Sequence, residues 1–318
     1  MSRVRVLGRE WRHPVACASG ALAAHLPGLE SAVTRGASAV FTKTITEEPR
    51  DGHPGPAFLT FEDEGYALNA MGLPNPGLEG MRRELRAFRE RYDVPLYASI
   101  AAEDPEGFER LARGLRGEVD GLEVNVSCPH AGRGMGAELG TDPGLVGEIV
   151  EAVVGAFDGP VSVKLTPNAD RRTLLEVAAA AVDAGADALT AVNTLGPCLR
   201  IDLRTASPLL GAGVGGLSGP ALKPVALRVV ADLALELGDE VEILGVGGVR
   251  SGEDVLEFLM AGARAVQVAT AARDRSFSEI AREAERALRD LGYGDFEEVI
   301  GAALPEYEER LRRLGWVG

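Results

Sequence analysis

Residues 120–130, Asp-Gly-Leu-Glu-Val-Asn-Val-Ser-Cys-Pro-His, decide the fold that we expect for this chain. The β-branched residues and the partial alternation of apolar and polar side chains predict a buried strand over the first part of this stretch. The proline that follows, and the glycines after it, then force the backbone into a loop. Cys128 should therefore stand at the C-terminal tip of a strand.

Eight strand-like runs alternate with helical runs along the chain, which is the pattern of a (β/α)8 TIM barrel. An open, doubly wound sheet is the structural alternative. The barrel is favoured because polar residues follow nearly every strand, and a barrel gathers the residues from one end of its strands into one site. The runs begin near Val15, Ser38, Pro95, Asp120, Pro160, Asp187, Val241 and Ala265.

The sequence also predicts the conformation of four segments outside the strands. Glu47–Gly72 should be an irregular loop excursion, and Leu195–Gly219 a second insertion. Pro220 should occupy the first position of a helix that reaches about Leu237, where its missing N–H costs nothing. The glycine-rich loop Pro129–Gly140 is a candidate lid over a site at the strand ends.

Length and composition are those of a globular protein, with 318 residues, 46% of them hydrophobic and 25% charged. No linker divides the chain, so we expect a single domain over residues 1–318. The formal charge is 33 minus 48, or −15, which argues against a nucleic-acid or anionic-membrane surface. Any anionic ligand must then be attracted by a local cluster of lysines and backbone N–H groups.

The three cysteines, Cys17, Cys128 and Cys198, form no close pair and no Cys-x-x-Cys motif. This spacing supports neither a disulfide framework nor a zinc or iron–sulfur site, and the four histidines lack the spacing of metal ligands. We therefore expect no metal. No apolar run has the length of a signal peptide or membrane helix, so a cytoplasmic location is expected.

A glycine-rich turn near the end of the chain predicts a phosphate site. Gly247 and Gly248 follow one strand, and Ala269-Thr270 follows the next. In a barrel these last two loops are the usual phosphate site, because exposed N–H groups bind the anion and glycine allows a close approach. Taken alone, a Gly-Gly pair is equally consistent with a tight strand-to-helix turn.

Lys164 lies in an otherwise apolar strand end, so its ammonium must either reach solvent or meet an anionic partner. A cation placed there can stabilise the N1–C2 carbonyl edge of a reduced flavin. The alternative is a lysine that snorkels to solvent at a strand tip. Lys43 has the same two interpretations.

Asn69, Asn125 and Asn193 come from different strand ends or loops, and together they suit a small planar ligand rich in carbonyl and N–H groups. Cys128 can then lie beside the bound ring, although a lone cysteine is also typical of a buried structural position. His130 is either a second acid or base, or an exposed loop residue.

Eight short segments resemble, in the same order, those of the dihydroorotate dehydrogenases, and they span nearly the whole chain. The resemblance implies a (β/α)8 barrel with FMN at its C-terminal mouth, oxidising dihydroorotate to orotate in pyrimidine biosynthesis. The segments are Ala18-Ser19-Gly20, Thr42-Lys43-Thr44, residues 69–75, residues 125–129, Val163-Lys164-Leu165, Asn193-Thr194, residues 215–220 and Gly247-Gly248.

When the functional residues of the family are matched to this sequence, the resemblance implies a role for each matching position. It implies that Cys128 is the catalytic base. The residues implied to bind the substrate are Lys43, Asn69, Met71, Gly72, Leu73, Asn125, His130, Asn193 and Thr194. Those implied to bind FMN are Ser19, Lys43, Thr44, Asn125, Lys164, Val192, Gly219, Gly247, Gly248, Ala269 and Thr270.

The cysteine at position 128 resembles the pattern of the soluble class 1 enzymes, because the membrane-associated class 2 members have serine at this position. Residues 193–196 and 215–224 most resemble the 1B type. That resemblance implies a partner, an electron-transfer subunit with FAD and a 2Fe-2S cluster that passes electrons to NAD. It also implies a homodimer, or a heterotetramer with the partner.

Two positions depart from the family pattern. His130 stands where many class 1 members have a substrate-binding Asn, and Ala269 where the phosphate loop often has Gly. The barrel of dihydropyrimidine dehydrogenase also has Cys-Pro-His followed by Gly-Met-Gly, as at residues 134–136 here. The alternative enzyme is therefore a uracil- or thymine-reducing flavoprotein, and the alternative of another class is a non-catalytic barrel that binds a phosphate ligand.

Overall fold

The computed structural model describes residues 3–126 and 139–316. At its centre parallel strands form a closed barrel in which chain order and barrel order coincide. This arrangement confirms the barrel and all eight expected strands, and it contradicts the open-sheet alternative. The barrel strands are β3 (Val15–Cys17), β4 (Val40–Phe41), β7 (Leu96–Ile100), β8 (Gly121–Asn125), β9 (Val161–Leu165), β10 (Ala188–Ala191), β15 (Glu242–Val246) and β16 (Ala265–Val268).

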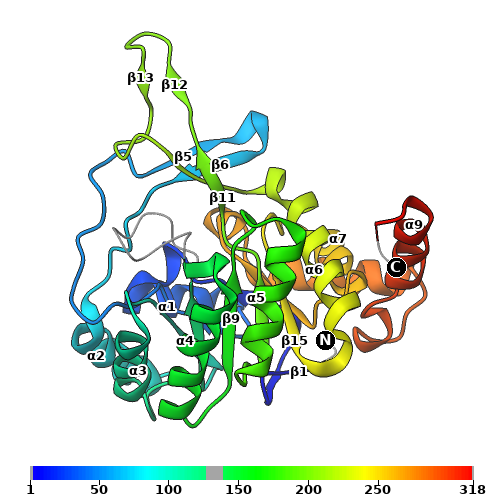
Figure 1. Ribbon diagram of the computed structural model, residues 1–318, viewed down its shortest axis with the longest axis horizontal. Coiled ribbons are helices and arrows are strands. Elements are labelled where there is room, and N and C mark those ends of the chain that lie inside the picture. The colour runs from blue at the N-terminus through cyan, green and yellow to red at the C-terminus, as the bar shows by residue number, and fades with distance from the viewer. Residues whose placement is uncertain (1–2, 127–138, 317–318) are drawn as a thin grey trace.

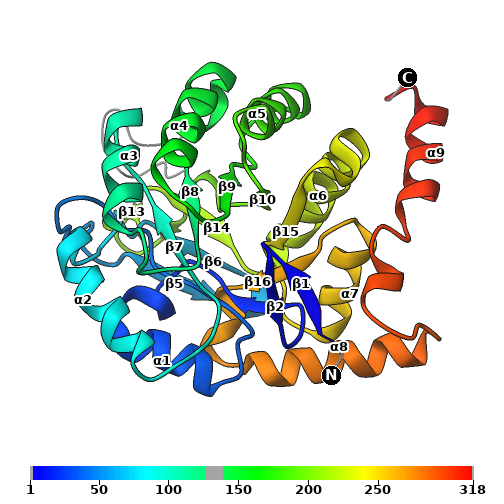
Figure 2. The same cartoon turned by 90° about the horizontal axis from the view of Figure 1, so that it is seen from below.

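Helices surround the barrel and bury their apolar faces against it (Figure 2). Most begin at a proline in the first turn or at a side-chain cap, such as Asp104 before α3 and Ser251 before α7. The helices are α1 (Leu26–Thr34), α2 (Gly77–Arg89), α3 (Pro105–Gly114), α4 (Pro143–Ala156), α5 (Arg171–Asp183), α6 (Lys223–Leu237), α7 (Gly252–Met260), α8 (Phe277–Asp290) and α9 (Leu304–Leu314).

Pro220 does not open the long helix that we expected. It begins a separate short helical turn, Pro220–Leu222, and α6 starts only at Lys223, with Pro224 in its first turn. Gly219 before the turn has φ +89°, a conformation that redirects the chain. The expected helix is therefore present up to Leu237, but a separate turn takes the place of its first turn.

The two insertions form a second sheet above the barrel, with strand order β11-β14-β6-β5 (Figure 1). The expectation of an irregular Glu47–Gly72 loop was wrong for its second half. Leu68 and Ala70 there pack with Leu210 in an apolar cluster of their own, which stabilises the sheet. The strands are β5 (Phe58–Phe61), β6 (Tyr66–Asn69), β11 (Leu195–Cys198) and β14 (Gly215–Ser218), and β12 (Ile201–Asp202) with β13 (Ser207–Pro208) forms a projecting hairpin.

A hairpin that the sequence did not predict, β1 (Val4–Val6) and β2 (Arg9–Trp11), lies across the opposite end of the barrel (Figure 2). Trp11 is 1% exposed, and its ring lies 6.0 Å from that of Tyr97 and 6.4 Å from that of Phe41. The indole Nε1 donates to the Tyr97 hydroxyl at 3.3 Å. This aromatic plug closes the N-terminal end, which leaves the other mouth for a ligand.

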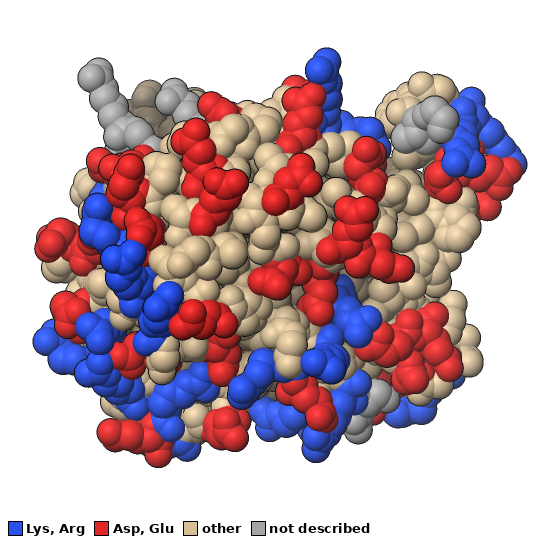
Figure 3. All heavy atoms as spheres, turned by 60° about the horizontal axis from the view of Figure 1, so that its bottom comes forward, with Lys and Arg blue, Asp and Glu red and all other residues tan. Residues whose placement is uncertain are grey.

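The surface carries charges of both signs. On the face in Figure 3, acidic side chains are spread over the middle and the upper part, and most basic side chains gather along the left and lower edges. Within residues 3–126 and 139–316, none of the helices combines the length and apolar character needed to cross a membrane.

The two tryptophans allow a matched test of the aromatic plug, because Trp11 is buried and Trp316 is 69% exposed. Removing a buried Trp leaves a cavity, so Trp11→Ala should lower the free energy of unfolding by about 3–5 kcal/mol. Trp316→Ala should change it by no more than about 0.5 kcal/mol. Urea unfolding followed by circular dichroism measures both, and equal midpoints for the two variants would refute the role of the plug.

Candidate active site

Two adjoining cavities open at the C-terminal mouth of the barrel. The first, here called the glycine cavity, has a volume of about 450 Å³ and is lined by Gly219, Gly247, Gly248 and Thr270 among others. The second, here called the amide cavity, has a volume of about 610 Å³ and is lined by Asn69, Asn125 and Asn193 among others. Both volumes lie in the range of small-molecule sites. Ser19, Lys164, Asn193, Thr194, Ser218, Ala269 and Thr270 line both cavities, so the two form one continuous site.

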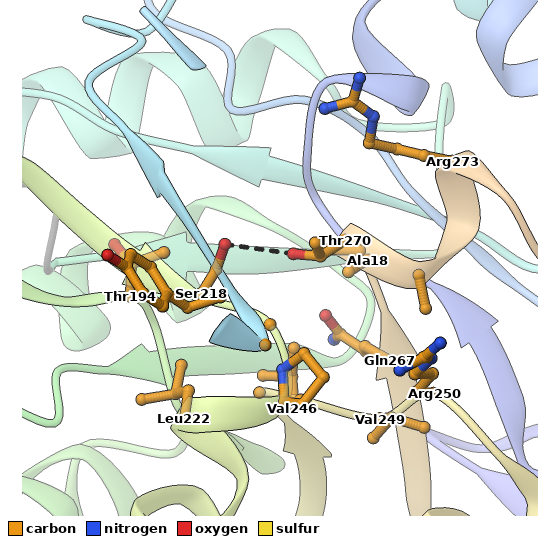
Figure 4. Close-up of a pocket in the computed structure, with 18 of the residues that line it drawn as sticks. Ala18, Thr194, Ser218, Leu222, Val246, Val249, Arg250, Gln267, Thr270 and Arg273 are labelled. Atoms are coloured by element: carbon orange, nitrogen blue, oxygen red, sulfur yellow. Dashed lines mark hydrogen bonds between the residues drawn. The ribbon is translucent and has the colours of Figure 1, made fainter. Parts of the chain in front are cut away.

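The glycine cavity is shaped by backbone that few other residues could adopt. Gly247 and Gly248 follow β15 with φ +122° and +88°. Opposite them, the Thr270 hydroxyl donates to Ser218 Oγ at 3.1 Å, a contact that links the loop after β16 to the upper sheet (Figure 4). The phosphate-site prediction therefore has the geometry that it needs, since two glycine-bearing loops and a helical turn starting at Thr270 border one cavity.

Asp254 fixes the conformation of the loop after Gly248. Its carboxylate accepts from the N–H groups of Arg250 and Ser251 at 2.8 and 2.7 Å, and from Lys223 Nζ at 2.6 Å. Burial raises the pKa of Asp254, but these hydrogen bonds outweigh burial and bring the pKa below its usual value. The carboxylate therefore stays ionised, and it holds the loop in one conformation.

A chain of hydrogen bonds crosses the mouth from β3 to β10. Thr44 Oγ1 lies 3.4 Å from Ser19 Oγ and 3.1 Å from Ser99 Oγ. Asn125 Nδ2 donates to Thr44 Oγ1 at 3.1 Å, and Asn193 Nδ2 donates to Asn125 Oδ1 at 3.2 Å. Each amide is thereby held in one orientation, which is what recognition of a planar ligand requires.

Lys164 does not snorkel to solvent, because it is only 5% exposed. Its Nζ lies 3.5 Å from Oε1 of Glu123, a carboxylate that is itself 0% exposed. The anionic partner required by the sequence is thus a residue of the neighbouring strand β8. The ammonium is held at the floor that the two cavities share, where it can still approach a ligand.

The upper sheet and the segment after it supply the roof of the amide cavity. Asn69 ends β6 and donates from Nδ2 to the Gly216 carbonyl at 3.1 Å, so its amide is oriented by β14. The Met71–Leu73 segment is braced by buried Asn75, whose Nδ2 donates to the Leu73 carbonyl at 2.8 Å. Part of the site is therefore built by segments that lie outside the barrel strands.

The structure brings together all the predicted site residues that it describes. The substrate candidates Lys43, Asn69, Met71, Gly72, Leu73, Asn125, Asn193 and Thr194 line the amide cavity. Of the cofactor candidates, Lys43, Thr44 and Asn125 line the amide cavity, and Ser19, Lys164, Val192, Gly219, Gly247, Gly248, Ala269 and Thr270 line the glycine cavity. Cys128, His130 and most of the candidate lid lie outside the described residues.

Sequence analysis missed Gln267, which lines the glycine cavity, and Ser99 and Glu123, which bond to residues of the site; all three are at most 1% exposed. Each lies in a barrel strand. The signal was present, because a Glu or a Gln inside an apolar strand needs a polar partner as much as Lys164 does.

A family model described as dihydroorotate dehydrogenase matches residues 1–288. The chain belongs to the dihydroorotate dehydrogenase family. It is 73% identical over 316 residues to a Methanopyrus kandleri protein named dihydroorotate dehydrogenase B (NAD(+)), catalytic subunit, covering 99% of each chain. Proteins with the same name from Methanothermobacter thermautotrophicus and Thermococcus kodakarensis are 42% and 43% identical, each with 95% of this chain covered and with 98% and 97% of the relative.

This membership confirms the resemblance. Enzymes of the dihydroorotate dehydrogenase family oxidise dihydroorotate to orotate and use FMN, so this chain is an FMN-dependent oxidoreductase. The site fits that cofactor on three observations. The glycine cavity offers a phosphate cradle, Lys164 offers a cation, and Gln267 Oε1 is a buried acceptor with no hydrogen-bond partner among the described residues.

The glycine cavity can be tested with two glycines that share a backbone conformation. A Cβ at Gly248 would lie 2.7 Å from Cβ of Lys223 and 3.0 Å from the Gly219 carbonyl, whereas one at Gly213, with φ +85°, would meet nothing within 4 Å. Gly248→Ala should therefore move the loop and weaken FMN binding at least about tenfold, through the loss of two or more hydrogen bonds. Gly213→Ala should bind FMN like the wild type. Titration of apoprotein by flavin fluorescence measures both, and equal affinities would contradict the assignment.

Proposed function

We propose that this chain is the catalytic subunit of a 1B-type dihydroorotate dehydrogenase, with FMN across both cavities and dihydroorotate in the amide cavity. The observation that carries the proposal is the continuous site, in which a phosphate cradle and a set of fixed amides share the floor that holds Lys164. The names of the relatives support the type.

The charge of the amide cavity favours dihydroorotate over an uncharged dihydropyrimidine. Lys43 is 8% exposed and lines this cavity, and Arg273 lines it as well. In a chain with net charge −15, these cations make a local site for a carboxylate. Dihydroorotate carries such a carboxylate, whereas dihydrouracil does not.

Each polar group has a distinct task in the proposed reaction. When bound, FMN would supply the acceptor for a hydride from C6 of the substrate. Asn69, Asn125 and Asn193 would hold the polar edge of the substrate ring, and Lys164 would stabilise the electron-rich edge of the cofactor. Cys128 removes the proton from C5, because a base is needed on the ring face opposite the cofactor.

The names of the relatives contain NAD(+) and the words catalytic subunit, so we infer an electron-transfer subunit with FAD and a 2Fe-2S cluster. We expect a homodimer of this chain, or a heterotetramer with that subunit. We also infer that residues 1–318 act as one FMN-binding domain in the cytoplasm. Co-purification with the partner, followed by light scattering, measures the composition of the complex.

The role of Cys128 predicts the rate and the pH dependence of FMN reduction. Cys128→Ala should keep FMN and bind orotate, yet dihydroorotate should reduce its FMN about 10²–10⁴-fold more slowly, the usual worth of a positioned base. In the wild type the rate should rise with pH until the thiolate dominates, since an ordinary thiol has a pKa of about 8.5. Stopped-flow absorbance measures both effects.

Cys128→Ser is the matched control, since it keeps the size of the side chain and carries a weaker acid. Its rate should fall between those of wild type and Cys128→Ala, and it should recover only at higher pH. A wild-type rate and pH profile in Cys128→Ala would place the base elsewhere, and His130 would be the next residue to substitute.

A further inference from the structure

Glu123 is a fully buried carboxylate with two nitrogen partners. It is 0% exposed in the middle of β8, where Oε1 lies 3.5 Å from Lys164 Nζ and Oε2 accepts from Gln267 Nε2 at 3.0 Å. Both partners line the glycine cavity, whereas Glu123 itself does not. A buried charge is costly unless it is paired, so its place in this barrel calls for an explanation.

The carboxylate determines how Gln267 is oriented. An ionised carboxylate only accepts hydrogen bonds, so the Gln267 side chain must turn its NH₂ group toward Glu123. Its carbonyl oxygen Oε1 must then point away from Glu123. This oxygen is buried and has no hydrogen-bond partner among the described residues. Figure 4 shows Gln267 among the side chains of the glycine cavity.

We propose that Glu123 is a positioning residue of the cofactor site, holding Lys164 and Gln267 so that the cavity floor presents one ammonium and one carbonyl acceptor. The inference rests on FMN as the occupant. Gln267 lines the glycine cavity but not the amide cavity, whereas Lys164 lines both. Gln267 Oε1 therefore accepts from a hydroxyl of the ribityl chain, which joins the phosphate to the ring. The negative charge of Glu123 partly neutralises Lys164, and so limits how strongly Lys164 stabilises negative charge on the flavin ring.

The test measures FMN affinity and reduction potential in four single variants and in the double variant Glu123→Gln/Gln267→Met. Gln267→Met removes the acceptor at nearly constant shape, and Glu123→Gln removes the charge while keeping a carbonyl for Lys164. Ser162→Ala is the control, because Ser162 is also 0% exposed and lies opposite Glu123 in the β8–β9 register. Among the described residues its hydroxyl donates to the Leu122 carbonyl, within the barrel wall. Lys164→Ala gives the reference for loss of the cation.

Gln267→Met and Glu123→Gln should each weaken FMN binding to the apoprotein about 3- to 10-fold, the worth of one hydrogen bond. The double variant should bind FMN no more weakly than the weaker-binding of the two single variants, because both changes remove the same contact. Glu123→Gln should raise the reduction potential of bound FMN and Lys164→Ala should lower it, since they remove opposite charges. Ser162→Ala should match the wild type in both measurements.

Wild-type affinity in Gln267→Met would overturn the assignment of the acceptor. Additive losses in the double variant, or a potential in Glu123→Gln that stays constant or falls, would overturn the positioning role. If Glu123→Gln does not fold, Gln267→Met against Ser162→Ala still decides whether the acceptor binds FMN. Failure of the wild-type apoprotein to bind FMN would instead refute the proposed function, so the two failures are distinguishable.

Discussion

Closure of the parallel strands into one barrel is the constraint on which the rest of this structure depends. Parallel strands in a closed ring all end at the same mouth, so residues far apart in sequence meet there. Ser19, Asn125 and Asn193 lie on β3, β8 and β10 or just after them, yet they belong to one hydrogen-bonded chain through Thr44. The aromatic plug around Trp11 closes the other end, so ligands have one place to enter.

The site works against the charge of the protein as a whole. A chain with net charge −15 has to bind a cofactor phosphate and, on our proposal, a substrate carboxylate. It does so with backbone N–H groups at glycine turns and with lysines that are almost fully buried, where water screens their charge poorly. Burial of Lys164 is possible because Glu123 lies beside it. The carboxylate thus reduces the cost of the cation and fixes its position.

The barrel itself could be predicted from the sequence, because each buried strand such as Gly121–Asn125 carries a local pattern that needs no partner to be recognised. The hairpin Phe58–Asn69 could not. Its partner is β14, where Gly216 pairs with Asn69 across 147 residues of chain, and such a pairing leaves no local signal. The β1–β2 hairpin was missed because two three-residue strands are too short to show a period.

The candidate site divides in the same way. The residues that line the two cavities followed from strand ends and from the family resemblance, whereas the partners that orient them did not. Asn75 belongs to the motif at residues 69–75, but its hydrogen bonds to Leu73 and Thr46 depend on the folded structure. Glu123 and Gln267 could not be assigned from the sequence, because a polar residue in a buried strand does not show which residue it will bond to.

The most direct test of the account is the choice of substrate by the intact holoenzyme. Dihydroorotate and dihydrouracil differ by the carboxylate that the amide cavity, with Lys43 and Arg273, is proposed to bind. Each is mixed anaerobically with the FMN-loaded enzyme, and the loss of flavin absorbance is followed in a stopped-flow instrument. The account predicts fast reduction by dihydroorotate and little or none by dihydrouracil. Faster reduction by dihydrouracil would contradict it.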